Sequence, residues 1–233
     1  MSANYEAKLG ILVLDTGFPR ILGDVGNPKT WPFPVIMKTV KGASPTKVTG
    51  SEVNSLLDAF SDAANELIDE GADGITTTCG FLAWLQEPLA KRCSVPVATS
   101  SLLQISSINA LLPPGRRTGV ITFSSKLLTN SHVEGVGAPA DTPRQGLSKD
   151  SMFYRMIMEG HNEIDTDQAK QDVIQAGKTL VDNHPDVGAI VIECANMPPY
   201  SAGLRHELQL PVYDPYTFIT WFYSSLSPTR FEA

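Results

Sequence analysis

The sequence contains two apolar runs rich in β-branched residues, and each of them ends at a cysteine. The cysteines are Cys79 and Cys194, and a Pro-Val pair begins 17 residues after each one, at Pro96 and Pro211. This repeated spacing indicates an internal duplication with a period near 115 residues. The period is too long for a solenoid and favours two similar α/β lobes.

A strand and a helix are expected before each cysteine-ending run. The continuous apolar run over 10–14 predicts a strand that is buried on both faces, and residues 118–123 predict a second strand. Helical spacing of apolar residues predicts helices over about 49–71 and 165–183, the second capped by Asp165 or Thr166. The order strand, helix, strand predicts parallel βαβ units.

Residues 18–45 are rich in glycine and proline and are expected to form a long loop. Long loops inside compact domains are often functional lids. We therefore expect this segment to close over a site.

These patterns predict an α/β fold of two pseudo-symmetric lobes, each a parallel sheet flanked by helices. Residues 1–98 and 212–233 are assigned to one lobe and residues 99–211 to the other. Ligands of open parallel sheets bind at the carboxyl ends of the strands. Cys79 and Cys194 are therefore expected to flank one active site in the cleft between the lobes.

Two thiols on opposite sides of a ligand can invert a carbon stereocentre. One thiolate removes a proton from one face while the other thiol delivers a proton to the opposite face. A free cysteine titrates near pH 8.5, so the site must favour the thiolate. We predict that Cys79 and Cys194 are the catalytic acid/base pair, whereas Cys93 has no counterpart in the repeat and is expected to be structural.

Polar side chains at the predicted strand ends fit a small carboxylate. Hydroxyl groups, amides and loop N–H groups can hold a carboxylate without a metal ion. The residues of this kind are Asp15, Thr16, Thr78, Thr122, Ser124, Ser125 and Asn196.

Composition excludes several classes of partner. The net charge is −7 and there is no basic run, which argues against nucleic acid. No apolar stretch approaches the roughly 20 residues of a membrane helix, and the first residues do not resemble a signal peptide, so a cytoplasmic protein is expected. The three cysteines lack metal-site spacing, and no glycine-rich nucleotide motif is present. We expect neither a metal ion nor a cofactor.

Three motifs resemble the aspartate/glutamate racemase superfamily, which includes hydantoin racemases, maleate isomerases and arylmalonate decarboxylases. They are Leu14-Asp15-Thr16-Gly17 after the first strand, Thr78-Cys79-Gly80, and Glu193-Cys194-Ala195-Asn196-Met197, which is followed by Leu210-Pro211-Val212. The resemblance implies two lobes, two catalytic cysteines without a cofactor, and a homodimer. It also places Gly80, Phe81 and Ala195 beside the substrate.

The chain departs from glutamate racemases next to both cysteines. Those enzymes have Asn-Thr after the first cysteine and Thr-His after the second, where this chain has Gly80-Phe81 and Ala195-Asn196. The second motif is more similar to hydantoin racemases. A glutamate substrate is therefore disfavoured.

The sequence as a whole predicts a cofactor-independent racemase or epimerase of an amino acid, a related carboxylate or a hydantoin. Two alternatives stay open. One is a lyase or isomerase similar to arylmalonate decarboxylase or maleate isomerase, which would use one of the cysteines. The other is a non-catalytic two-lobed protein that binds a small anion.

Overall fold

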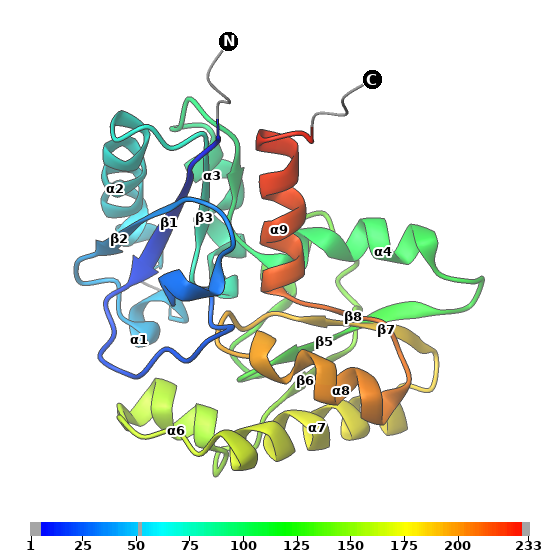
Figure 1. The fold of residues 1–233 in the computed structure, drawn as a ribbon. Coiled ribbons are helices and arrows are strands. Elements are labelled where there is room, and N and C mark those ends of the chain that lie inside the picture. Colours follow the sequence, from blue (N-terminus) through cyan, green and yellow to red (C-terminus); the bar gives the residue numbers. More distant parts are fainter. Residues whose placement is uncertain (1–5, 51–52, 230–233) are drawn as a thin grey trace.

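The computed structural model describes residues 6–50 and 53–229 and shows two lobes, each built on a parallel four-stranded sheet (Figure 1). The sheet orders are β2-β1-β3-β4 and β6-β5-β7-β8, which is the same order in both lobes. The predicted two-lobed α/β fold is confirmed. The strands are β1 Leu9–Leu14, β2 Val35–Val40, β3 Gly74–Thr77, β4 Val97–Ala98, β5 Arg117–Thr122, β6 Arg144–Gly146, β7 Val187–Ile192 and β8 Val212–Tyr213.

Helices cover the faces of both sheets (Figure 1). The longest helix, α7, begins where the Asp165 side chain accepts hydrogen bonds from the N–H groups of Asp167 and Gln168, which is one of the two predicted caps. The α-helices are α1 Pro45–Val48, α2 Leu57–Asp69, α3 Gln86–Ala90, α4 Ile105–Leu111, α5 Asn130–Glu134, α6 Met152–Glu159, α7 Thr166–Asn183, α8 Ser201–Leu208 and α9 Pro215–Leu226. Short 3-10 helices are η1 Pro28–Thr30, η2 Val53–Leu56, η3 Gly80–Leu85, η4 Ser101–Gln104 and η5 Pro198–Tyr200.

Strand β1 is buried on both of its faces. Leu12 belongs to the apolar cluster that contains residues of α2, whereas Ile11 belongs to the cluster that contains Phe218 of α9. Successive side chains of a strand point to opposite faces, so α2 and α9 cover opposite sides of the first sheet. This explains why β1 is a continuous apolar run.

The predicted loop over 18–45 is interrupted by strand β2. This strand pairs in parallel with β1, from Leu9 beside Val35 to Leu14 beside Val40. It lies at the edge of the sheet, and its side chains are mostly half-buried. The Pro-rich approach at Pro32 and Pro34 concealed the strand, because proline is depleted from the interior of sheets.

Two element boundaries also differ from the expected ones. Strand β8 pairs with β7, so the second sheet extends two residues beyond the boundary expected at 211, and α9 then returns to the first lobe. The helix expected from residue 49 begins as α2 only at Leu57. It is preceded by α1 and η2, and residues 51–52 lie outside the described residues.

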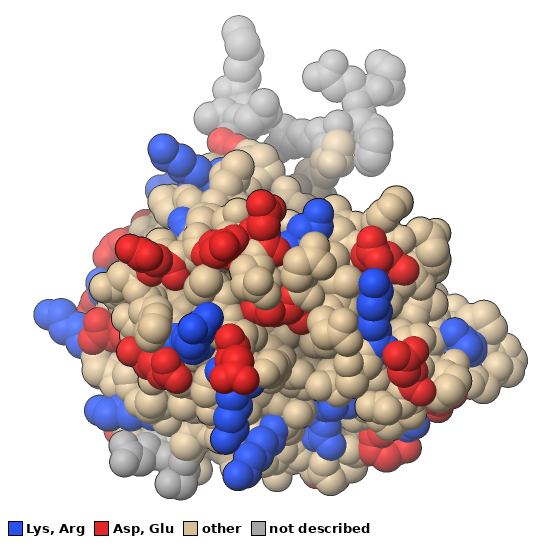
Figure 2. All heavy atoms as spheres, turned by 90° about the horizontal axis from the view of Figure 1, so that it is seen from below, with Lys and Arg blue, Asp and Glu red and all other residues tan. Residues whose placement is uncertain are grey.

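The surface carries charges of both signs. Figure 2 shows acidic and basic side chains interspersed on the face seen from below, without a large area of one sign. Such a face has no extended field of the kind that attracts nucleic acid. Among the described residues, none of the helices combines the length and the apolar character needed to cross a bilayer.

The buried stripe of α2 gives a test of the core. Leu67 is fully buried, whereas Leu111 at the end of α4 is 76% exposed. We expect Leu67→Ala to lower the free energy of unfolding by about 2–5 kcal/mol, because the change leaves a cavity. The control Leu111→Ala should change it by less than about 0.5 kcal/mol. Equilibrium unfolding in urea measures both, and equal effects would contradict this assignment of the core.

Candidate active site

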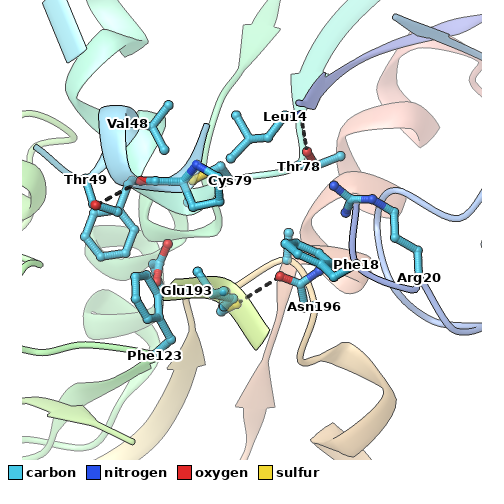
Figure 3. A pocket seen from close by; sticks show the side chains of 16 residues that line it. Leu14, Phe18, Arg20, Val48, Thr49, Thr78, Cys79, Phe123, Glu193 and Asn196 are labelled. Carbon is cyan, nitrogen blue, oxygen red and sulfur yellow. Dashed lines mark hydrogen bonds between the residues drawn. The ribbon is translucent and has the colours of Figure 1, made fainter. Parts of the chain in front are cut away.

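Cys79 and Cys194 line one small pocket between the two lobes (Figure 3). Cys79 follows β3 and precedes η3, and Cys194 lies two residues beyond the end of β7. Side chains from both lobes complete the pocket, which encloses about 30 Å³. The duplicated sheets therefore bring their equivalent strand ends together, as expected from the repeat. The roles of the two thiols in catalysis stay a prediction.

The environment of Cys79 contains both favourable and unfavourable influences on a thiolate. Burial and the nearby carboxyl of Glu193 raise the pKa of the thiol to about 12. The backbone N–H groups of Phe81 and Leu82, in the first turn of η3, and the Arg20 guanidinium act in the opposite direction. The balance of these influences favours the neutral thiol, while donors for its anion are in place.

Cys194 is more deeply buried, with 6% of its surface exposed. Burial raises its pKa well above the ordinary value, and Glu193, Cys79 and Asp24 add to this shift. Its Sγ donates to Oδ1 of Asn196 over 3.5 Å. Of the two thiols, Cys79 therefore has the more favourable surroundings for a thiolate.

Glu193 is a site residue that the sequence analysis did not include. It lines the pocket and is 1% exposed. Its Oε2 accepts a hydrogen bond of 2.7 Å from Oγ1 of Thr122, and the backbone N–H of Phe81 also donates to the carboxyl. Burial raises its pKa to about 7. A charged residue at the end of the apolar run before Cys194 was the available signal.

Gly80 is required for the position of Glu193. A Cβ atom at Gly80 would overlap both Oε1 and the carbonyl oxygen of Glu193. The absence of a side chain at residue 80 therefore allows the carboxyl to lie directly against the turn after Cys79.

Arg20 brings a positive charge to the pocket from the loop after β1. Its guanidinium pairs with Oδ1 of Asp24 over 3.1 Å and donates to Oγ1 of Thr16 over 3.0 Å. It also lies over the ring of Phe18, 5.1 Å from the centroid. Like Glu193, Arg20 was not identified from the sequence, because an arginine in a loop has no distinguishing pattern.

The same loop is joined to the segment after Cys194. Asn196 Nδ2 donates to Oδ2 of Asp24 over 2.6 Å, and the N–H of Val25 donates to the carbonyl of Ala195 over 3.1 Å. Asp24 is 2% exposed, and this burial raises its pKa despite the nearby Arg20. The loop after β1, which belongs to the first lobe, thus holds Ala195 and Asn196 next to Cys194 in place. The predicted lid role of this loop stays a prediction.

The residues predicted to bind substrate fall into two groups. Thr78, Gly80, Phe81, Ala195 and Asn196 line the pocket. The pocket lining does not include Asp15, Thr16, Thr122, Ser124 or Ser125.

The second group has local structural contacts. Asp15 accepts from the N–H of Gly42 over 2.9 Å, and Thr16 accepts from Arg20. Thr122 reaches the pocket only through Glu193, and its Oγ1 also accepts from the N–H of Ser124 over 3.4 Å. Within 6–50 and 53–229, no cluster of three or more His, Cys, Asp or Glu side chains could hold a metal ion.

The chain is similar in sequence to proteins named dimethylsulfoniopropionate lyases. It is 29% identical over 223 residues to "Dimethylsulfoniopropionate lyase" of Durusdinium sp. clade D, covering 90% of this chain and 71% of that protein. It is 26% identical over 242 residues to "Dimethylsulfoniopropionate lyase 3" of Emiliania huxleyi, covering 96% of this chain. The chain spans 63% of the length of the Emiliania protein. No family model matches the sequence.

Solved structures with the same fold are enzymes as well. A cysteine variant of arylmalonate decarboxylase superposes with a TM-score of 0.66 at 17% identity, covering 97% of this chain and 95% of that one. The aspartate racemase of Picrophilus torridus superposes with a TM-score of 0.59 at 13% identity, covering 97% and 96%. The chain therefore shares the fold of these enzymes, which is the fold that the resemblance seen in the sequence implies.

The raised pKa of Glu193 predicts a pH-dependent effect on stability. The folded protein favours the neutral carboxyl, and this contribution is complete below about pH 4.5 and is lost as the pH rises through about 7. Glutamine cannot ionise. We therefore expect Glu193→Gln to gain about 3 kcal/mol relative to the parent protein between pH 4.5 and pH 8.

Urea unfolding at the two pH values measures this gain. The control is Glu163→Gln, because Glu163 is exposed. The control should alter stability equally at both pH values. An effect of Glu193→Gln that does not depend on pH would contradict the raised pKa.

Proposed function

We propose that this chain is a cofactor-independent lyase that removes the proton next to a carboxylate and expels a sulfide from the following carbon. The observation that carries the proposal is the pocket itself, in which two strand-end thiols lie beside a buried carboxyl and an arginine. The similarity to proteins named dimethylsulfoniopropionate lyases supports the choice of reaction. Dimethylsulfoniopropionate is accordingly the substrate to test first.

Cys79 is the base in this proposal. Its thiolate forms an S–H bond with the α-proton, and the electron pair of the broken C–H bond forms the new C=C bond. The bond between the β-carbon and sulfur breaks, and its electron pair leaves with sulfur as a neutral sulfide. From dimethylsulfoniopropionate the products are dimethyl sulfide and acrylate. No second proton transfer is needed, which leaves Cys194 without an obligatory chemical step.

The substrate itself assists ionisation of the base. Burial and Glu193 keep Cys79 neutral in the empty pocket. A bound sulfonium cation would offset the negative charge of Glu193, and the N–H groups of Phe81 and Leu82 would then stabilise the thiolate. Arg20 is the pocket cation available to the substrate carboxylate and to the enolate charge that develops on it. Stabilising this charge is typically worth several kcal/mol.

A racemase is the second candidate, and the presence of two thiols in one pocket favours it. Racemisation needs an acid and a base on opposite faces of the stereocentre, so it would require both Cys79 and Cys194. A lyase of the proposed kind requires only the base. The racemase therefore requires Cys194 for turnover, whereas the lyase does not.

Serine substitutions test the assignment of the base. We expect Cys79→Ser to lower kcat for release of acrylate from dimethylsulfoniopropionate by about 100-fold or more, because an alcohol is a far weaker acid than a thiol. Cys194→Ser should lower it by less than about tenfold, since the hydroxyl retains the polar contact to Asn196. The control is Cys93→Ser, because Cys93 lies outside the pocket. Acrylate is quantified by proton NMR, and full activity of Cys79→Ser would refute the proposed base.

Solvent exchange separates the lyase from the racemase. We expect the parent protein in D₂O to form acrylate from dimethylsulfoniopropionate and to leave each enantiomer of aspartate, glutamate and a 5-substituted hydantoin unlabelled. A racemase would incorporate deuterium at the α-carbon of both enantiomers of its substrate without eliminating a group. Labelling of this kind that is lost in both Cys79→Ser and Cys194→Ser would favour the second candidate.

A further inference from the structure

The pocket contains a carboxyl group whose charge nothing in the described structure neutralises. Two buried carboxyls lie at the site, those of Asp24 and Glu193. Asp24 is paired with Arg20 over 3.1 Å and also accepts from the N–H of Gly26 over 2.7 Å. Glu193 accepts only from the neutral Thr122 hydroxyl and the Phe81 N–H, and within 6–50 and 53–229 it forms no ion pair.

A buried carboxylate without a cation is costly, and the cost falls when a cation enters with the ligand. Arg20 and Asp24 balance each other, so ionised Glu193 leaves the pocket with one unmatched negative charge. A dicarboxylate would add to this imbalance. A zwitterion leaves the total charge unchanged, and it can place its positive group against Glu193 and its carboxylate at Arg20.

The apolar lining of the pocket indicates which kind of positive group it favours. Phe81 and Phe123 line the same pocket, with ring centroids 5.2 Å apart, and Leu14 and Val48 add aliphatic surface. Sulfonium and quaternary ammonium groups have no N–H donors and are bound by aromatic faces and a negative charge. A primary ammonium would need several acceptors, which these apolar walls do not supply.

We propose that Glu193, together with the rings of Phe81 and Phe123, forms a subsite for the onium group of the substrate, while Arg20 takes the carboxylate. This inference rests on the proposed function and names the group that the pocket selects. In the view of Figure 3, Glu193 and Arg20 lie on different sides of Cys79. Because the pocket encloses only about 30 Å³, it must widen to admit a zwitterion that reaches both groups, and such a ligand would lie beside the proposed base.

A pair of unreactive ligands isolates the charge of the onium group. 3-(Trimethylammonio)propionate and 4,4-dimethylpentanoate have the same shape and differ in one atom, positively charged nitrogen against neutral carbon. We expect the parent protein at pH 8 to bind the ammonium compound about tenfold more tightly, as measured by isothermal titration calorimetry.

Glu193→Gln should reduce this preference to less than about threefold while leaving the affinity for 4,4-dimethylpentanoate nearly unchanged. The control Glu163→Gln should retain the full preference, because Glu163 is exposed and lies outside the pocket lining. The inference is overturned if the parent protein fails to bind the ammonium compound, if it binds the two ligands equally, or if Glu193→Gln keeps the preference.

Binding and turnover can fail independently. A charge preference that Glu193→Gln abolishes, in a protein that does not release acrylate, would support the onium subsite and refute the lyase. Acrylate release by a protein without a charge preference would support the lyase and refute the subsite.

Discussion

The convergence of strand ends is the constraint on which this structure depends. In a parallel sheet the carboxyl ends of adjacent strands lie at one edge, and here two such sheets of equal strand order turn those edges toward each other. Cys79 and Cys194 need no special local conformation to meet, because the ends of β3 and β7 carry them to the same pocket. The two thiols are thus placed by the packing of whole lobes rather than by a flexible loop.

Removal of water determines the chemistry that this arrangement can perform. Burial raises the pKa of both thiols and of the carboxyls of Glu193 and Asp24, so the empty site favours neutral groups. An electrostatic interaction introduced by a ligand is correspondingly strong in such a place. Neutral thiols are weak nucleophiles, and only the thiolate form of either cysteine would be reactive.

The sequence alone predicts the two lobes, the buried strands and the position of both cysteines, because these follow from periodicity and from a repeated spacing. It did not predict β2, since the prolines before Val35 are typical of a loop. It also did not predict Arg20 or Glu193 as site residues. Their importance arises from contacts across the fold, such as Thr122 with Glu193 and Asp24 with Asn196, 71 and 172 residues apart in the chain. No local pattern encodes such distant contacts.

The close approach of Gly80 to Glu193 links two positions that are 113 residues apart in the sequence, since 193 − 80 = 113. A side chain at residue 80 and the carboxyl of Glu193 would occupy the same space. A substitution at Gly80 therefore requires a change at residue 193. Glutamate racemases have asparagine directly after the first cysteine, and an asparagine at residue 80 of this chain would occupy the place of the Glu193 carboxyl. In this chain the glycine of one lobe leaves room for the acid of the other, so a carboxyl group lies against the turn after Cys79.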